Sequence, residues 1–244
     1  MAYANVQSRP KVVEVSTYDG DIRDTFAAAP TVGNLVVVVG GGGSEAVTWS
    51  VRDNQGGANI YTVQQSSTVG NHHCFVAWTV VAASSGIFTV IATQGGEKDT
   101  SLQISEWSGN ATSSVMDIAV SGSPSSSLTP YVLSTGSSTA GAGELIVTSF
   151  NCDASITLTA APSTGYTSLL EVNGTLNSGY AKTTAAAYKI AGSAGVENAT
   201  WPDYSASGVI GVIVAFKAAA GASSDPAASS SRFTTSRHTF GTRR

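Results

Sequence analysis

Charged residues are scarce in this sequence: Asp, Glu, Lys and Arg make up 11% of its 244 residues, against roughly 25% in a typical soluble domain. Serine, threonine, glycine and alanine fill the gap, so hydroxyl and backbone groups must solvate much of the surface. This composition is common in extracellular and particle-associated β proteins and unusual in cytosolic enzymes that depend on charge for solubility. Hydrophobic residues still make up 42% of the chain, which is enough for a sizeable core.

Long apolar runs are also missing. The longest candidate is VIGVIVAF at 209–216, well short of the roughly 18 residues that a membrane-spanning helix needs. The first residues, MAYANVQSRPKVVEV, lack the apolar segment of a secretory signal. These two features predict a chain that neither spans a membrane nor uses the usual export route.

Cysteine is rare, because Cys74 and Cys152 are the only two and have no CxxC spacing. We interpret them as small buried hydrophobic residues. His72 and His73 precede Cys74, but adjacent side chains in a strand point to opposite faces, so only His72 and Cys74 could share a metal ion. The only other histidine is His238. We therefore predict no metal site here, and a pair of solvated histidines at a strand edge.

Short apolar runs bounded by Gly, Ser, Asn and Pro recur along the whole chain. Examples are VVEV, NLVVVV, VTWSV, FVAWTVV, IFTVIA and LQISEW. Their alternation and β-branched content predict strands, and no window sustains the i, i+3, i+4, i+7 spacing of an amphipathic helix. The sequence therefore predicts an all-β fold.

A repeat with a period of about 110 residues is visible in four segments. VGNLVVVV at 32–39 aligns with AGELIVTS at 142–149, and AWTVVAASSG at 77–86 aligns with AYKIAGSAG at 187–195. The other two matches are VTWSV (47–51) with ITLTA (156–160) and LQISEWSG (102–109) with GVIVAFKA (211–218). A nearly constant offset over so long a stretch indicates duplication of one unit.

Each unit is long enough for two packed antiparallel sheets. We predict two jelly-roll-like β-sandwich copies, at residues 1–108 and 109–218, followed by a linker and arm at 219–244. Sequence symmetry does not say which strands pair, so a single sandwich that mixes strands of both copies is the alternative.

The run Gly40–Gly43 follows four valines and invites comparison with a phosphate-binding loop. Such a loop has the spacing GxGxxG or GxxxxGK[ST] and leads into a helix. Here Glu45 stands where the last glycine should be, no lysine follows, and VTWSV continues as a strand pattern. We interpret the glycines as a mobile hairpin loop and predict no nucleotide cofactor.

Carboxylates that could serve as catalytic acid and base are sparse. YDGDIRD carries Asp19, Asp21 and Asp24, and Glu106 lies beside Trp107. The aspartates depart from the calcium-loop pattern and are typical of a solvated turn. No GxSxG elbow occurs among the many serines. We predict no catalytic residue and no enzymatic activity; the rival is a polysaccharide-cleaving enzyme that uses Glu106 or Asp19.

The aromatic residues divide into two groups. Trp49, Trp78 and Tyr188 lie within apolar strand patterns and are predicted to be core residues. Trp201 and Tyr204 lie in NATWPDYSASG, whose proline indicates a loop. A tryptophan and a tyrosine in a loop can stack on a sugar ring, so contact with a host surface glycan is the alternative to simple loop packing.

The strand and turn patterns resemble a repeated β-sandwich module found in bacteriophage virion proteins and in some bacterial surface proteins. They are APTVGNLVVVV, VTWSVRDNQGGANIYT, FVAWTVVA, GIFTVIAT and LQISEWSG, with a weaker second copy that ends in VIGVIVAFKAA. The resemblance covers about residues 24–218. It implies a structural or adhesive role, such as a head decoration protein, a head fibre or a tail-associated protein assembled in the host cytoplasm, and it carries over no functional residue.

Residues 219–244, AAGASSDPAASSSRFTTSRHTFGTRR, have a different composition. Their first half is a Ser/Ala/Gly linker that cannot build a core, and no acid follows Asp225. We predict an arm that docks on a capsid, tail or sister subunit, with Phe233 and Phe240 as apolar anchors and four arginines facing acidic groups. The arginines are Arg232, Arg237, Arg243 and Arg244.

The charge of this arm also allows two other partners. It could fold back over its own sandwich, because the arm carries about +4 and the remainder about −8 of the net charge of −4. Nucleic acid is the weaker partner, since four charges without a basic body around them make a small footprint.

Overall fold

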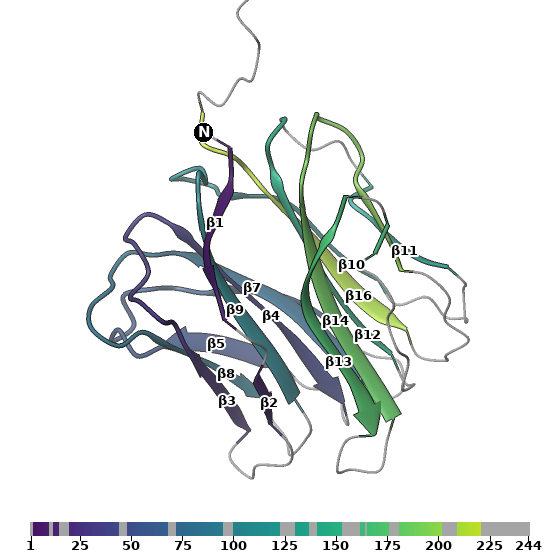
Figure 1. Cartoon of the computed structure of the whole chain (residues 1–244), viewed down its shortest axis with the longest axis horizontal. Coiled ribbons are helices and arrows are strands. Elements are labelled where there is room, and N and C mark those ends of the chain that lie inside the picture. Colours follow the sequence, from purple (N-terminus) through teal and green to yellow (C-terminus); the bar gives the residue numbers. More distant parts are fainter. Residues whose placement is uncertain are drawn as a thin grey trace, which may run out of the picture.

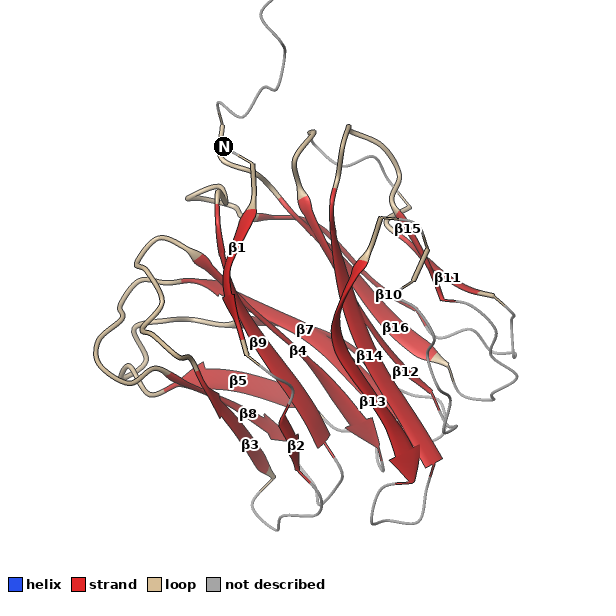
Figure 2. Ribbon diagram, viewed as in Figure 1, coloured by secondary structure: helices blue, strands red, loops and turns tan. Residues whose placement is uncertain are grey.

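A computed structural model gives an all-β protein, as the sequence predicts (Figure 2). It describes residues 2–9, 12–14, 20–43, 48–67, 72–94, 100–122, 130–136, 141–152, 162–163, 165–175, 181–201 and 209–220. No helix occurs in these ranges, and thus none that is long and apolar enough to cross a membrane.

The first half of the chain forms a larger and a smaller antiparallel sheet (Figure 1). The larger sheet has the order β1-β9-β4-β7-β6, and β2 also pairs with β9. Its strands are β1 (Ala4–Ser8), β2 (Val12–Glu14), β4 (Leu35–Gly43), β6 (Thr62–Ser67), β7 (His72–Val80) and β9 (Thr100–Ser108). The smaller sheet has the order β3-β8-β5, from β3 (Asp21–Thr25), β5 (Trp49–Asp53) and β8 (Thr89–Gln94).

The second half also has a larger and a smaller sheet. The larger sheet has the order β10-β16-β12-β14-β13 and the smaller one pairs β11 with β15. Their strands are β10 (Met116–Gly122), β11 (Tyr131–Ser134), β12 (Leu145–Cys152), β13 (Thr167–Thr175), β14 (Ala181–Ile190), β15 (Asn198–Trp201) and β16 (Ile210–Phe216).

The two larger sheets place residues that align in the sequence at matching positions. Leu35 lies opposite Trp107 in the first sheet, and Leu145 lies opposite Phe216 in the second. Every ladder between the described strands joins two strands of the same half. The duplication of one unit remains a prediction, and so does the jelly-roll form of each half.

The sheets stack in four layers, with the two larger sheets in the middle. This stacking explains the uninterrupted apolar runs. In β4, Val36 and Val38 pack against the first half's smaller sheet, while Leu35, Val37 and Val39 pack against the second half. A central strand covered on both faces has no position left for a polar residue that faces water.

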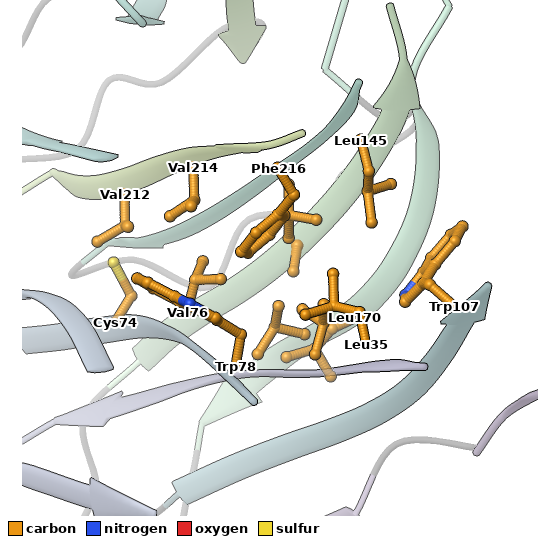
Figure 3. Packing of buried hydrophobic residues seen from close by; sticks show 14 of the residues in the cluster. Leu35, Cys74, Val76, Trp78, Trp107, Leu145, Leu170, Val212, Val214 and Phe216 are labelled. Atoms are coloured by element: carbon orange, nitrogen blue, oxygen red, sulfur yellow. The ribbon is translucent and has the colours of Figure 1, made fainter. Parts of the chain in front are cut away.

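The central core lies between the two larger sheets, and Figure 3 shows its side chains pointing toward one another from both halves. Trp78 packs edge-on against Phe216 with 5.3 Å between ring centroids. The prediction that Trp49 and Trp78 are core residues is confirmed, while Tyr188 is half-buried at the rim of this core. The halves are therefore held together by a continuous apolar interface.

The glycine run is not a hairpin loop, so that interpretation was wrong: Gly40–Gly43 form the last part of β4. A Cβ at Gly40 would lie 2.8 Å from a ring carbon of Phe75 and closer still to the backbone oxygen of Ser101. Ser149 of the second half donates to the Gly40 carbonyl (3.3 Å). Glycine is required here because side chains and a backbone approach this strand from both faces.

This packing predicts a penalty for Gly40→Ala. The added methyl group would press on the Ser101 carbonyl, which is fixed in a ladder, so we expect the free energy of unfolding to fall by about 1–3 kcal/mol. Gly192→Ala is the matched control, because a Cβ there meets nothing within 4 Å. Urea denaturation of both variants measures the difference. Equal stability of the two variants would contradict the close approach at β4.

Candidate functional site

The residues predicted to form the docking arm lie outside the described residues. They are Arg232, Phe233, Arg237, Phe240, Arg243 and Arg244. The described chain ends at residue 220, and hydrogen bonds fix the preceding residues to the junction between the halves. Ala219 N donates to Gly109 O (2.8 Å), and Lys217 N donates to Val115 O (2.7 Å). The root of the arm is therefore a defined part of the fold.

The N-terminus meets the same root. Buried Tyr3 donates its hydroxyl to Lys217 O at 2.9 Å, and Figure 1 shows the two ends of the described chain together at the top. Asn110 Nδ2 donates to Gly33 O (3.1 Å), and a Cβ at Gly143 would lie 3.9 Å from the Ala218 side chain. Loops of both halves thus touch the root. We call the region formed by Tyr3, Gly33, Asn110, Gly143 and residues 217–219 the arm end.

Burial raises the pKa of Tyr3, and the nearby charge of Glu144 raises it further. Burial likewise raises the pKa of Tyr131, with a second contribution from Cys74. The folded protein therefore keeps phenol protons that the unfolded chain releases above pH 10. Below pH 10 these groups therefore give the free energy of unfolding no pH dependence. Above pH 10 they make it fall as the pH rises, because only the unfolded chain loses the protons.

Tyr3→Phe tests this linkage. Each buried phenol should contribute a slope of about 1.4 kcal/mol per pH unit above pH 10, so the variant should lose stability less steeply than the wild type. At neutral pH the variant should be about 1 kcal/mol less stable, because the Lys217 carbonyl loses its donor. Urea unfolding at several values from pH 7 to 11 measures both effects. Identical slopes for the two proteins would contradict the assignment.

Two loops of the first half are joined to each other by the side chain of Asn59. Asn59 Nδ2 donates to Asp53 Oδ2 (2.8 Å) and to Ala83 O (2.9 Å). Its Oδ1 accepts from Ala82 N (2.7 Å) and Ala83 N (3.0 Å). Three of these bonds join loop 54–61 to loop 81–88, and the fourth joins it to the end of β5. The preceding residues add further bonds, such as Asn54 Nδ2 to Ile87 O at 2.8 Å.

The loop before β4 in the first half and the loop before β12 in the second are held by equivalent backbone bonds. Gly33 N donates to Val81 O (2.9 Å), and Gly143 N donates to Ala191 O (2.7 Å). Each bond is accompanied by a return bond, from Val81 N to Asn34 O (2.9 Å) and from Ala191 N to Glu144 O (2.8 Å). The same pair of backbone bonds therefore fixes the equivalent loop in each half.

These fixed loops expose large apolar side chains. The exposed fractions are 76% for Ile60, 73% for Ile87, 59% for Val32 and 50% for Val196. Ile87 and Val196 occupy aligned positions in the two halves, each directly after a glycine. The strand pattern IFTVIA predicts that Ile87 begins a strand, whereas β8 begins at Thr89 and Ile87 lies in the turn before it.

The glycan-contact interpretation was wrong for Trp201. This residue belongs to β15 and is 1% exposed. Its ring stacks on Phe150 with 5.1 Å between centroids, inside the core between the second half's two sheets. A sugar ring has no access to it. Tyr204 lies outside the described residues.

Glu106 is a structural residue of the first half. It is 1% exposed, and its Oε1 accepts from Thr31 N (2.8 Å) and Asn34 Nδ2 (2.6 Å). Its Oε2 accepts from Gln7 Nε2 at 2.6 Å. The carboxylate therefore joins β9 to β1 and to the loop before β4. Asp19, the other acid considered for catalysis, lies outside the described residues.

The prediction of a solvated turn at the aspartates was wrong for Asp21 and Asp24, which belong to β3. Burial tends to raise the pKa of Asp21, but bonds from Thr93, Arg23 and Arg52 outweigh it and hold the pKa below its usual value. Asp24 is buried, and this burial raises its pKa despite a bond from Thr25 N and the nearby Arg9.

The prediction of solvated histidines at a strand edge was also wrong. His72 and His73 are buried in β7, which lies between β4 and β6. His73 Nδ1 accepts from Trp49 Nε1 at 3.1 Å, which places the histidine in the aromatic core. The described residues contain no group of three or more His, Cys, Asp or Glu side chains that could hold a metal ion.

The interpretation of the cysteines as buried hydrophobic residues is confirmed. Cys74 and Cys152 are both buried and not disulfide-bonded. Burial raises the pKa of the Cys74 thiol, although Ser149 partly offsets the shift. The thiol therefore stays protonated and is a poor nucleophile.

Comparisons with known protein families, curated proteins and solved structures found no match to this chain.

Proposed function

We propose that this chain is a non-enzymatic structural protein of a bacteriophage particle, such as a head decoration protein, a head fibre or a tail-associated protein. Its partners would be other virion proteins, namely the capsid, the tail or sister subunits. The proposal rests on the structural role of Glu106. This acid, the most plausible for catalysis among those described, is buried and accepts three hydrogen bonds from its own framework.

Other buried polar groups support the same function. The amide of Asn59 joins two loops. The amide of Asn151 donates across the interface of the halves to Gly42 O (3.1 Å) and within the second half to Thr184 Oγ1 (2.9 Å). A polar network of this kind specifies one packing of the sheets. The low charge of the surface and the fixed loops at the arm end suit a protein that is held among neighbours.

Purified particles of the virus that encodes the chain test the proposal. Particles banded in a density gradient should contain the chain, detected by mass spectrometry, and a specific antibody should label a fixed part of each particle in electron micrographs. Recovery of the chain only from the soluble fraction of lysed cells would overturn the proposal.

A further inference from the structure

The smaller sheet of the first half has an inner face that joins the core and an outer face that carries two arginines. Val90 and Ala92 of β8 are buried in the core beneath this sheet, so Ile91 between them faces outward. Arg23 of β3 and Arg52 of β5 both lie directly opposite Ile91 in the ladders. The three side chains therefore form one row across the outer face.

Asp21 brings the two guanidinium groups of this row together. Its Oδ2 accepts from Arg23 Nη2 (3.1 Å) and from Arg52 Nη2 (2.8 Å). Thr93 donates to the other carboxylate oxygen and accepts from Arg52 Nη1 (2.6 Å). Because both guanidinium groups bond to the same oxygen atom, a single ligand group can reach both of them. We call Asp21, Arg23, Arg52 and Thr93 the arginine cluster.

The charges of the arginine cluster are unequally exposed. The side chain of Asp21 is 11% exposed, whereas those of Arg23 and Arg52 are 57% and 52% exposed. A ligand that approaches from solvent therefore meets two cations, and the carboxylate is largely covered. The bonds within the cluster use one N–H of Arg23 and two of Arg52. A guanidinium group has five N–H donors, so both arginines keep donors for an anionic ligand.

The fold does not require charges at this position. The second half's smaller sheet, formed by β11 and β15, also lies at the outside of the stack (Figure 1). The side chains of these two strands that do not enter the core are all uncharged: Val132, Ser134, Asn198 and Thr200. Ion pairs of exposed arginines also contribute little to stability. The arginine cluster is therefore better explained by binding than by stability.

The composition of the outer face favours a protein carboxylate as the ligand. The planar N–H fork of arginine pairs with the two oxygen atoms of a carboxylate. Arginine beside an apolar side chain, without lysine, is typical of protein–protein interfaces. None of the outward-facing residues of β3, β5 and β8 is aromatic, so none can stack on a sugar ring. Two cations and one anion leave a single net positive charge, which is a small footprint for nucleic acid.

We propose that the arginine cluster and Ile91 form a docking site for an acidic side chain of a neighbouring virion protein. The carboxylate of a partner's aspartate or glutamate would accept from Arg23 and Arg52, and an apolar side chain beside it would cover Ile91. Asp21 and Thr93 hold the guanidinium groups before binding, so docking loses less conformational entropy. This inference rests on the proposed function and adds a contact surface and the chemistry of the partner.

The test uses particles assembled without this chain, to which the purified full-length protein is added at several salt concentrations. The bound chain is quantified after sedimentation of the particles. Arg23→Gln with Arg52→Gln should bind at least about tenfold more weakly than the wild type, because charge-assisted hydrogen bonds are lost. Binding of the double variant should also depend less on salt. Arg23→Gln alone keeps the bonds of Arg52 to Asp21 and Thr93, so it should fold as the wild type does and bind about threefold more weakly.

Arg9→Gln is the matched control. It removes a partly exposed cation of the first half whose side chain lies 3.7 Å from buried Asp24 and not in the arginine cluster. This variant should bind within about twofold of the wild type, because salt screens charges outside the contact.

Three results would overturn the docking site. If the double variant melts at the wild-type temperature and binds the particles equally well, the site is wrong and the proposed function stands. If the wild type binds polygalacturonate, an acidic polysaccharide, as tightly as it binds the particles and the double variant does not, the partner is an anionic glycan and not a protein. If the wild-type chain does not bind the particles and is absent from native ones, both proposals fail.

Discussion

Trp107→Ala is expected to lower the free energy of unfolding by about 3–5 kcal/mol. The indole is fully buried, and its ring meets that of Tyr188, from the second half, with 4.7 Å between centroids. Its Nε1 donates to Ser105 Oγ at 2.9 Å. Removing it would leave a cavity at the interface of the halves and take away one of the contacts that joins them. Urea denaturation followed by circular dichroism measures the loss.

Trp107→Phe is the control, because it keeps an aromatic ring in the same space and should lose clearly less stability. Trp107→Ala should also make the transition less cooperative, since the two halves share the core that this residue closes. A loss below about 1 kcal/mol for Trp107→Ala would show that the halves do not depend on this contact.

Glu106→Ala should destabilise the protein by about 3 kcal/mol, because three buried or half-buried donors lose their acceptor. These donors are Thr31 N, Asn34 Nδ2 and Gln7 Nε2. Asp117→Ala is the control: Asp117 pairs with partly exposed Lys217 at 3.3 Å, and such surface pairs contribute about 0–1 kcal/mol. Thermal melting of the two variants gives the comparison.

The same pair of variants separates a structural Glu106 from a catalytic one. If Glu106 is structural, Glu106→Ala should lose much stability and the wild type should not hydrolyse polysaccharide. If Glu106→Ala kept its stability and abolished a measurable hydrolysis, the acid would be catalytic and the chain an enzyme.

The strands could be predicted from the sequence because alternation and β-branched residues are local signals. The strand conformation of Gly40–Gly43 and the burial of His72 and His73 could not be predicted, because both depend on which sheets stack. Once the halves pack through their larger sheets, β12 covers the end of β4, and a run that is typical of a loop becomes a buried strand. Repetition in the sequence shows that two units exist but contains no information on the face by which they meet.

The candidate site was harder to predict for a related reason. Trp201 follows a strand-like pattern so short that the proline after it dominated the interpretation, yet it fills the core of the second half. Ile60 and Ile87 begin the strand-like runs IYTV and IFTVIA, and only the structure shows that they lie exposed in the loops before β6 and β8. Exposure is a property of the packed molecule, so a single sequence cannot report it.

Deletion of residues 226–244 tests the central claim, that the chain is a particle component held at its arm end. The shortened and full-length chains are supplied in equal amounts to particles assembled without the protein, and the copies bound per particle are counted by quantitative mass spectrometry. The account predicts that the full-length chain occupies the particles and that the shortened chain, folded to the same melting temperature, is largely lost from them. Equal occupancy by the two chains would contradict it.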